Sequence, residues 1–257
     1  MQLRCGRKNN KLIELRRLKK RCKFAHSYIY FISYPFPLNS QTEENYLKAI
    51  YKITERDNRH AGTNAIAAAM HTAAASVTDM IKKLANKQFI HYEKNKGVIL
   101  TEDGLQLARK MVRKHRLWET FLYEKLHFAW DEVHDIAEQL EHIQSDELVE
   151  RLDTLLGHPR FDPHGDPIPD AQGNFTARPQ VLLSEMNVGE SGILVGVKED
   201  SSIFLKYLDK ICLNLGTIVE IAECFEYDGS MRIRINHQTE QIISPKVSQN
   251  LFIKRKT

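Results

Sequence analysis

The sequence has few cysteines and no long hydrophobic run, and both features limit the kinds of protein it can encode. Its 257 residues contain four cysteines, none of them in a Cys-x-x-Cys pair: Cys5, Cys22, Cys212 and Cys224. This spacing argues against a zinc ribbon or a disulfide framework and favours reduced thiols. No segment reaches the roughly 18 apolar residues that cross a membrane, so we expect a cytoplasmic protein with no membrane partner.

Motifs of the common enzyme classes are also missing. The sequence contains no glycine-rich phosphate loop and no nucleophile elbow. The stretch Glu138-x-x-Glu141-His142 comes near a zinc-protease motif, but Glu138 stands where that motif requires a histidine. No separate general base accompanies it. We therefore expect neither an enzyme nor a small organic substrate.

Positive charge is concentrated at the start of the chain. Residues 1–23 hold ten Lys or Arg against one acid, Glu14, although the whole chain carries only +4. The apolar segment that follows is interrupted by polar residues such as His26 and Ser27 and lacks a cleavage pattern, unlike a secretory signal. We predict that residues 1–40 are a basic, disordered extension, which either adds phosphate contacts or reflects a start codon assigned too early.

Residues 41–102 have the pattern of a winged helix-turn-helix. A first helix is predicted from Thr42 as N-cap to about residue 56–59, a second over 64–70 and a third over 73–84, with a turn at 71–72. The third helix buries a stripe that includes Val77 and Ile81. The residues off this stripe are predicted to face DNA: Ala74, Ala75, Ser76, Thr78, Asp79 and Lys82.

Two short β segments, 89–93 and 98–101, follow the third helix and predict the wing. Lys94 and Lys96 lie at its tip, where they would contact phosphates. A generic helical domain carrying a hairpin is the alternative. The order of the elements favours the winged helix.

Residues 103–158 predict an all-helical domain. A long helix runs from residue 102 or 103 to 126, and such a helix commonly carries a dimer interface. Asp131 is expected to cap the next helix, and Ser145 a third that ends at Leu156. Residues 159–179, rich in proline and glycine, predict a linker without helices. Residues 180–257 contain several short β segments and one short helix at 201–208, which indicates a small β-barrel. The fold class is therefore mainly α and multidomain.

One segment of the helical domain concentrates metal-binding side chains. An α-helix turns about 100° per residue, so His134, Glu138, Glu141 and His142 would share one face. His115 and Glu119 lie one turn apart on the long helix. Imidazole and carboxylate ligands together suit manganese, iron(II), cobalt or zinc, and the lack of a thiolate favours a harder ion. A solvated face of ordinary charge pairs is the alternative.

These segments together resemble the diphtheria-toxin-repressor family of metal-dependent regulators, which includes the manganese transport regulator. The resemblance covers about residues 42–257 and rests on four stretches: 42–51, 113–119, 133–147 and 165–169. It implies an N-terminal winged helix-turn-helix, a helical metal-binding and dimerisation domain, and a C-terminal FeoA-like or SH3-like β domain.

The resemblance also implies the ligands. His115, Glu119 and His134 match one metal-binding set of the family. Glu138, Glu141 and His142 match the other, and Glu138 favours Mn²⁺ over Fe²⁺ because iron-responsive members have cysteine there. The first helix contributes Asn45 where those types have Met or Asp, and Lys48 where the manganese type has a second carboxylate. In longer members the C-terminal domain can add a ligand, here Glu199 or Asp200.

The function that the resemblance implies is a metal switch. A homodimer loaded with Mn²⁺ or Fe²⁺ would bind a palindromic double-stranded DNA operator and repress metal-uptake genes. The alternative is a winged-helix regulator whose metal ions are structural and which responds to another effector.

Overall fold

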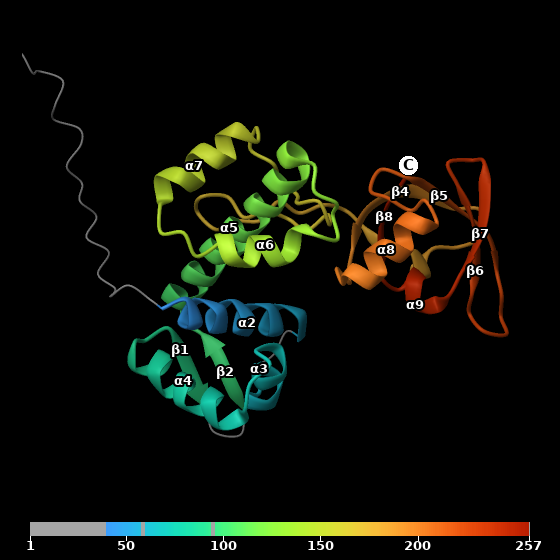
Figure 1. Ribbon diagram of the computed structural model, residues 1–257. Coiled ribbons are helices and arrows are strands. Elements are labelled where there is room, and N and C mark those ends of the chain that lie inside the picture. Colours follow the sequence, from blue (N-terminus) through green and yellow to red (C-terminus); the bar gives the residue numbers. More distant parts are fainter. Residues whose placement is uncertain (1–39, 58–59, 94–95, 257) are drawn as a thin grey trace, which may run out of the picture. The chain divides into compact units, whose positions relative to one another are not determined.

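The computed structural model describes residues 40–57, 60–93 and 96–256 (Figure 1). The predicted extension, apart from Ser40, and the predicted phosphate contact Lys94 lie outside the described residues. No helix in the described part of the chain is long and apolar enough to cross a membrane.

The first part of the fold is a winged helix-turn-helix, as predicted. Its elements are α2 (Gln41–Asp57), α3 (Thr63–Ala69), α4 (Ala74–Asn86), β1 (Ile90–Glu93) and β2 (Gly97–Leu100). Leu47 and Ile50 of α2 are fully buried against Ile66, Val77 and Phe89. Burial of these apolar side chains is the main contribution to the stability of this part.

The cap of α2 differs from the prediction. Ser40, and not Thr42, begins the helix: Ser40 Oγ accepts from the Glu43 backbone N–H at 3.3 Å. Glu43 Oε2 accepts in return from the Ser40 N–H at 2.8 Å. This reciprocal capping box satisfies two backbone donors, whereas Thr42 lies exposed in the first turn.

The wing packs against the segment before α3. Ala61 N–H donates to Val98 O at 2.8 Å, and Val98 N–H donates to Ala61 O at 2.9 Å. Gly97 sits at φ +115°, and a Cβ there would lie 2.6 Å from the Ala61 oxygen. The close approach of the two backbones therefore requires glycine at the start of β2.

The helical part is built around α5 (Glu102–Leu126), with α6 (Val133–Leu140) and α7 (Asp146–Leu155). Helix α5 contacts α2, α6 and α7, so it connects the winged helix to the rest of this part (Figure 1). Thr101 caps α5 by accepting from Gly104 N–H at 3.1 Å, and Ser145 caps α7 as predicted.

One prediction about α6 was wrong. Asp131 does not cap it, because α6 begins at Val133, and Asp131 instead accepts from Ser202 Oγ and Lys206 Nζ at 3.1 Å each. The helix also ends at Leu140, which leaves Glu141 at the C-cap and His142 in a turn. Glu141 keeps helical dihedral angles, and its N–H donates to Ala137 O at 2.9 Å, so this predicted ligand still belongs to the last turn of α6.

The C-terminal part is a bent antiparallel sheet with the strand order β3-β8-β4-β5-β6-β7. Its strands are β3 (Val181–Leu182), β4 (Ser191–Val197), β5 (Ile218–Cys224), β6 (Met231–Ile235), β7 (Thr239–Ile243) and β8 (Leu251–Arg255). Its short helices are η1 (Leu183–Glu185), α8 (Ser202–Lys210) and α9 (Pro245–Ser248). Irregularities in β4 and β5 bend the sheet around a core that includes Leu194 and Leu205. This is the small SH3-like β domain that was expected.

The proline-rich segment contains no helix, as predicted, but it packs against the helical part of the fold. Asp162, His164 and Ile168 are buried. Arg116 of α5 donates to Pro167 O at 2.6 Å, and Arg113 donates to Pro169 O at 2.8 Å. These hydrogen bonds hold the segment against α5 and bring its polar side chains to the candidate site.

Candidate metal centre

His115 lies at the centre of the site because both of its ring nitrogens face carboxylates. Nε2 lies 2.9 Å from Glu119 Oε1, and Nδ1 lies 2.7 Å from Glu141 Oε2. The three side chains are almost completely buried. Glu119 is one helical turn from His115, which the sequence predicted, whereas Glu141 comes from the end of α6. His115 therefore belongs to two ligand clusters at once.

The first cluster consists of His115, Glu119 and His134. His134 Nδ1 lies 3.2 Å from Glu119 Oε1 and 3.3 Å from His115 Nε2. All three donor atoms lie within 4.8 Å of one another. Two imidazole nitrogens and a carboxylate oxygen that converge in this way fit a divalent ion of the manganese, iron or zinc type.

The second cluster joins Glu138 and Glu141 to a residue of α2. Lys48 Nζ lies 2.7 Å from Glu138 Oε1 and 2.6 Å from Glu141 Oε1. Lys48 and Glu141 are buried, and Glu138 is about one third exposed. The resemblance placed Lys48 at a ligand position of the family, and the structure shows that its ammonium bonds both carboxylates.

The His142 side chain faces Glu44 of α2. Its Nδ1 lies 2.8 Å from Glu44 Oε2, and Gln144 Nε2 donates to Glu44 Oε1 at 2.8 Å. Glu44 is buried, and sequence reasoning treated it only as an acid in the first turn of a helix. Beside it, Asn45 Oδ1 is buried without a hydrogen-bond partner among the described residues. An unpaired buried acceptor is costly, so this oxygen suits a metal ligand.

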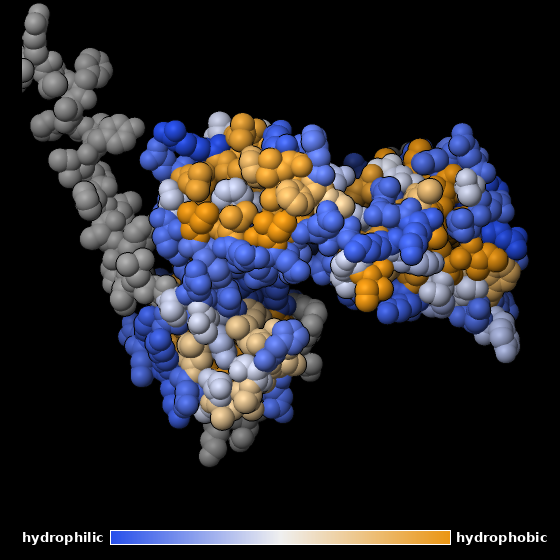
Figure 2. All heavy atoms as spheres, in the orientation of Figure 1, coloured by the Kyte–Doolittle hydropathy of each residue, from blue (hydrophilic) through white to orange (hydrophobic). Residues whose placement is uncertain are grey.

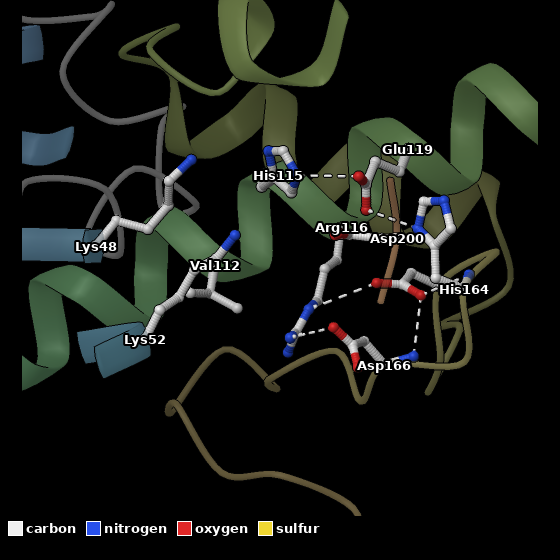
Figure 3. A pocket seen from close by; sticks show the side chains of 10 residues that line it. Lys48, Lys52, Val112, His115, Arg116, Glu119, His164, Asp166 and Asp200 are labelled. Carbon is white, nitrogen blue, oxygen red and sulfur yellow. Dashed lines mark hydrogen bonds and ion pairs between the residues drawn. The ribbon is translucent and has the colours of Figure 1, made fainter. Parts of the chain in front are cut away.

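Sequence reasoning missed a third cluster, Glu119, Asp162 and His164 (Figure 3). His164 Nε2 donates to Trp130 O at 2.8 Å, which leaves Nδ1 facing Glu119 Oε2 at 3.8 Å. Asp162 Oδ1 accepts from the backbone N–H of His164 at 2.8 Å. The sequence Asp162-Pro163-His164 carried a signal, two ligand types separated by one proline, but we interpreted the segment only as a linker.

Asp200 lines the same pocket, together with Lys48, Arg116, Asp162 and His164 (Figure 3). Of the two candidates from the C-terminal domain, Asp200 therefore lies at the site. Glu199 accepts a hydrogen bond from Ser201 Oγ at 2.7 Å. The pocket therefore brings together side chains of α2, of α5, of the proline-rich segment and of the loop after β4.

The electrostatics of the site reflect many buried charges. Burial opposes the charged form of Glu119, but hydrogen bonds from His115, His134 and His164 hold its pKa well below the usual range. Despite burial, the Glu119 carboxylate raises the pKa of His164 to about 9. Burial and the nearby Glu119 raise the pKa of Asp162 to about 7. The protonated His164 and the Lys48 ammonium therefore provide positive charge at the site, as a metal ion would when bound.

The predicted DNA face of α4 is exposed along its length. The side chains concerned are Ala74, Ala75, Ser76, Thr78, Asp79 and Lys82, and all of them are exposed. Val77 and Ile81 are buried on the opposite face. Lys82 Nζ lies 3.3 Å from Asp79, and Lys96 of the wing lies 2.6 Å from Glu93.

Helix α2 contacts both the residue that follows α4 and the candidate ligand clusters. Glu43 accepts from Lys87 Nζ, just after α4, at 2.9 Å. Glu44 and Lys48 of the same helix contact His142, Glu138 and Glu141, as described above. A winged helix whose first helix is bonded directly to clustered histidine and carboxylate side chains that could hold an ion is typical of metal-responsive DNA-binding regulators.

Comparison with known proteins identifies the family. The chain belongs to the iron dependent repressors. Residues 39–98 match the model described as "Iron dependent repressor, N-terminal DNA binding domain". Residues 101–170 match "Iron dependent repressor, metal binding and dimerisation domain". Residues 181–255 match the FeoA domain.

Individual relatives agree with this assignment. An uncharacterized HTH-type transcriptional regulator of Methanocaldococcus jannaschii is 37% identical over 117 residues, 46% of this chain and 94% of that protein. The HTH-type transcriptional regulator MntR of Oceanobacillus iheyensis is 33% identical over 119 residues, 46% of this chain and 80% of that protein. A solved manganese-dependent transcriptional repressor in complex with manganese is 31% identical, covers 83% of this chain and 100% of its own, and superposes with a TM-score of 0.74.

Proposed function

We propose that this chain represses metal-uptake genes by binding operator DNA when it carries manganese or iron(II). The observation that carries the proposal is the double attachment of α2. Glu43 binds the lysine that follows α4, and Glu44 and Lys48 bind the segment that holds the ligands. Occupation of the site by an ion would favour one arrangement of α2, and thereby one orientation of the recognition helix.

The proposed ligands fall into the three clusters described above. One ion would be held by His115, Glu119 and His134. The cluster of Glu119, Asp162 and His164 extends this site, with Asp200 nearby. The remaining proposed ligands are Glu138, Glu141, His142 and Asn45. When bound, the ion supplies positive charge that holds these carboxylates and imidazoles together.

Manganese is the favoured ion, and iron(II) is the next. The three clusters contain only nitrogen and oxygen donors, with no thiolate. Hard oxygen ligands beside imidazole suit Mn²⁺ and Fe²⁺, and Glu138 stands where iron-responsive members have cysteine. The family descriptions name iron and the structural relative names manganese, and the affinities of the chain for Mn²⁺ and Fe²⁺ are the measurement that tests this preference.

A homodimer is proposed because a hydrophobic surface covers the helical part. Figure 2 shows hydrophobic side chains gathered over the region that Figure 1 labels α5, α6 and α7. Large apolar residues of this part are exposed, with exposed fractions of 61% for Leu155, 53% for Leu126 and 37% for Leu148. An apolar surface of this kind suits a second copy of the chain. Two copies related by a twofold axis would place two α4 helices on a palindromic operator.

The test is a DNA-binding titration with and without metal. Duplexes bound by the manganese-loaded chain are selected from a random pool, and the affinity for the best duplex is measured under reducing conditions. We expect Mn²⁺ or Fe²⁺ to tighten binding and Ca²⁺ to have little effect. Equal affinity with and without metal would refute the proposal and favour the alternative, a winged-helix regulator with structural ions and another effector.

A further inference from the structure

The buried ammonium of Lys48 occupies the place between two carboxylates that are proposed to bind metal. Lys48 Nζ lies 2.7 Å from Glu138 Oε1 and 2.6 Å from Glu141 Oε1, and the lysine is only 5% exposed. Such short, buried, charge-assisted hydrogen bonds are among the stronger ones in proteins. The second cluster therefore contains a cation that belongs to the chain itself.

We propose that Lys48 is a tethered competitor of the divalent ion and sets the metal concentration at which the second cluster fills. The inference rests on the proposed function, because it concerns the same ligands. An ion that binds Glu138 and Glu141 through these oxygens must displace the ammonium from them, since both cations use the same lone pairs and repel each other. The free energy of the two lost hydrogen bonds then weakens the binding of the ion.

The first cluster has no such competitor within the described part of the chain. Its donors are His115 Nε2, His134 Nδ1 and Glu119 Oε1, and no lysine or arginine nitrogen of residues 40–57, 60–93 and 96–256 is hydrogen-bonded to any of them. An ion there displaces protons only. The two clusters share His115 but differ in their resident cation, so we expect two binding events of unequal affinity, the weaker one at Glu138 and Glu141.

The pocket that Lys48 lines also contains acidic side chains. Among them are Asp162, Asp166 and Asp200 (Figure 3). Lysine has a flexible four-carbon stem and a compact ammonium, so it can change partners without moving α2. In the metal-free chain the same lysine links α2 to α6. The ion would therefore replace an existing link between these helices, not create the first one.

Isothermal titration calorimetry of manganese binding to the full-length chain, in the absence of DNA, tests the inference. Lys48→Gln removes the ammonium. It should lower the dissociation constant of the weaker binding event by at least about tenfold, because the ion then no longer has to break a charged hydrogen bond. Lys48→Arg keeps a cation and should shift the affinity less. Lys52→Gln is the matched control, because the exposed Lys52 lines the same pocket one turn further along α2, and its loss removes a nearby positive charge while the contacts of Lys48 with Glu138 and Glu141 remain.

A double-mutant cycle assigns the effect to the carboxylate pair. In a Glu138→Gln background, Lys48→Gln should tighten manganese binding less than it does in the wild-type chain, because only the Glu141 carboxylate then remains contested. A folded Lys48→Gln chain with unchanged or weaker manganese affinity would overturn the inference. Circular dichroism and the melting temperature report whether the variant folds.

A second measurement uses the wild-type chain and needs no variant. Acylation of Lys48 by acetic anhydride, followed by mass spectrometry, reports how accessible its amine is. We expect manganese to accelerate modification of Lys48 and leave that of the exposed Lys52 unchanged. A Lys48 rate that manganese leaves unchanged or lowers would refute displacement. If the wild-type chain binds manganese but its DNA affinity does not respond, the proposed function fails while competition by Lys48 stands.

Discussion

His115 Nδ1 lies 2.7 Å from Glu141 Oε2, and this contact joins the middle of α5 to the end of α6. Glu141 is fully buried and also bonds Lys48, so one carboxylate neutralises two positively charged or titratable groups from two other helices. Glu141 is therefore the residue on which the two ligand clusters and α2 converge.

Glu141→Ala is expected to destabilise the metal-free chain by about 3–5 kcal/mol, because Lys48 and His115 would lose a buried partner. The exposed Glu147→Ala, which removes only the surface pair with Arg151, should cost about 0.5 kcal/mol or less. Urea unfolding followed by circular dichroism measures both. Equal destabilisation by the two variants would show that Glu141 has no special role.

The same position should decide the response to metal. Glu141→Ala or His142→Ala is expected to abolish the increase in operator affinity that manganese causes, because each variant removes a bond between α2 and the ligand segment. DNA affinity measured by fluorescence anisotropy across a manganese titration checks this. A variant that is folded and still responds fully to manganese would contradict it.

The proline-rich segment should contribute to metal affinity. His164→Ala is expected to weaken manganese binding by about tenfold to a hundredfold, the range for loss of a ligand or its supporting partner. His127→Asn is the control, because His127 is exposed with φ +59°, a conformation that asparagine tolerates. Calorimetry measures both. Wild-type affinity in a folded His164→Ala chain would exclude this residue as a ligand.

Metal binding should release protons and strengthen as pH rises. The pKa of His164 is raised from 6.5 to about 9, so in the metal-free chain this residue is protonated at pH 7. Its pairing with Glu119 therefore stabilises the metal-free fold fully below about pH 6.5, and this contribution disappears as pH rises through about 9. The pKa of Asp162 is raised to about 7. Its proton therefore also stabilises the metal-free chain at low pH, and this contribution disappears as pH rises through about 7.

We accordingly expect the free energy of unfolding of the metal-free chain to fall between pH 6 and 9, while manganese affinity rises. Calorimetry in buffers of different ionisation enthalpy should detect release of about one proton per ion at pH 7. A binding enthalpy that is identical in all buffers would contradict the expectation.

The hydrophobic surface of the helical part should hold the dimer together. Leu155→Glu places a charge on this surface and is expected to shift the chain toward monomer in analytical ultracentrifugation. Ile203→Glu is the matched control, because Ile203 is 86% exposed but lies on α8. Loss of the dimer in both variants, or in neither, would place the interface elsewhere.

The sequence alone determined the order and type of the main elements. Apolar residues at helical spacing, as in Val77 and Ile81, and the cap Ser145 act over a few residues, so they can be recognised locally. The exposed face of α4 followed from the same periodicity. The pair His115 and Glu119, one turn apart on α5, could also be predicted because a single helix fixes their separation.

Tertiary structure decided which charged groups meet. Lys48 and Glu141 are separated by 93 residues, and Glu119 reaches His164 only because Arg113 and Arg116 hold the proline-rich segment against α5. The end of α6 at Leu140 turned His142 toward Glu44, which no local pattern indicated. Periodicity places a side chain on a face, but burial of charge depends on partners from distant segments. The sequence thus identified the candidate ligands, and only the folded chain determined that the Lys48 ammonium lies between two of them.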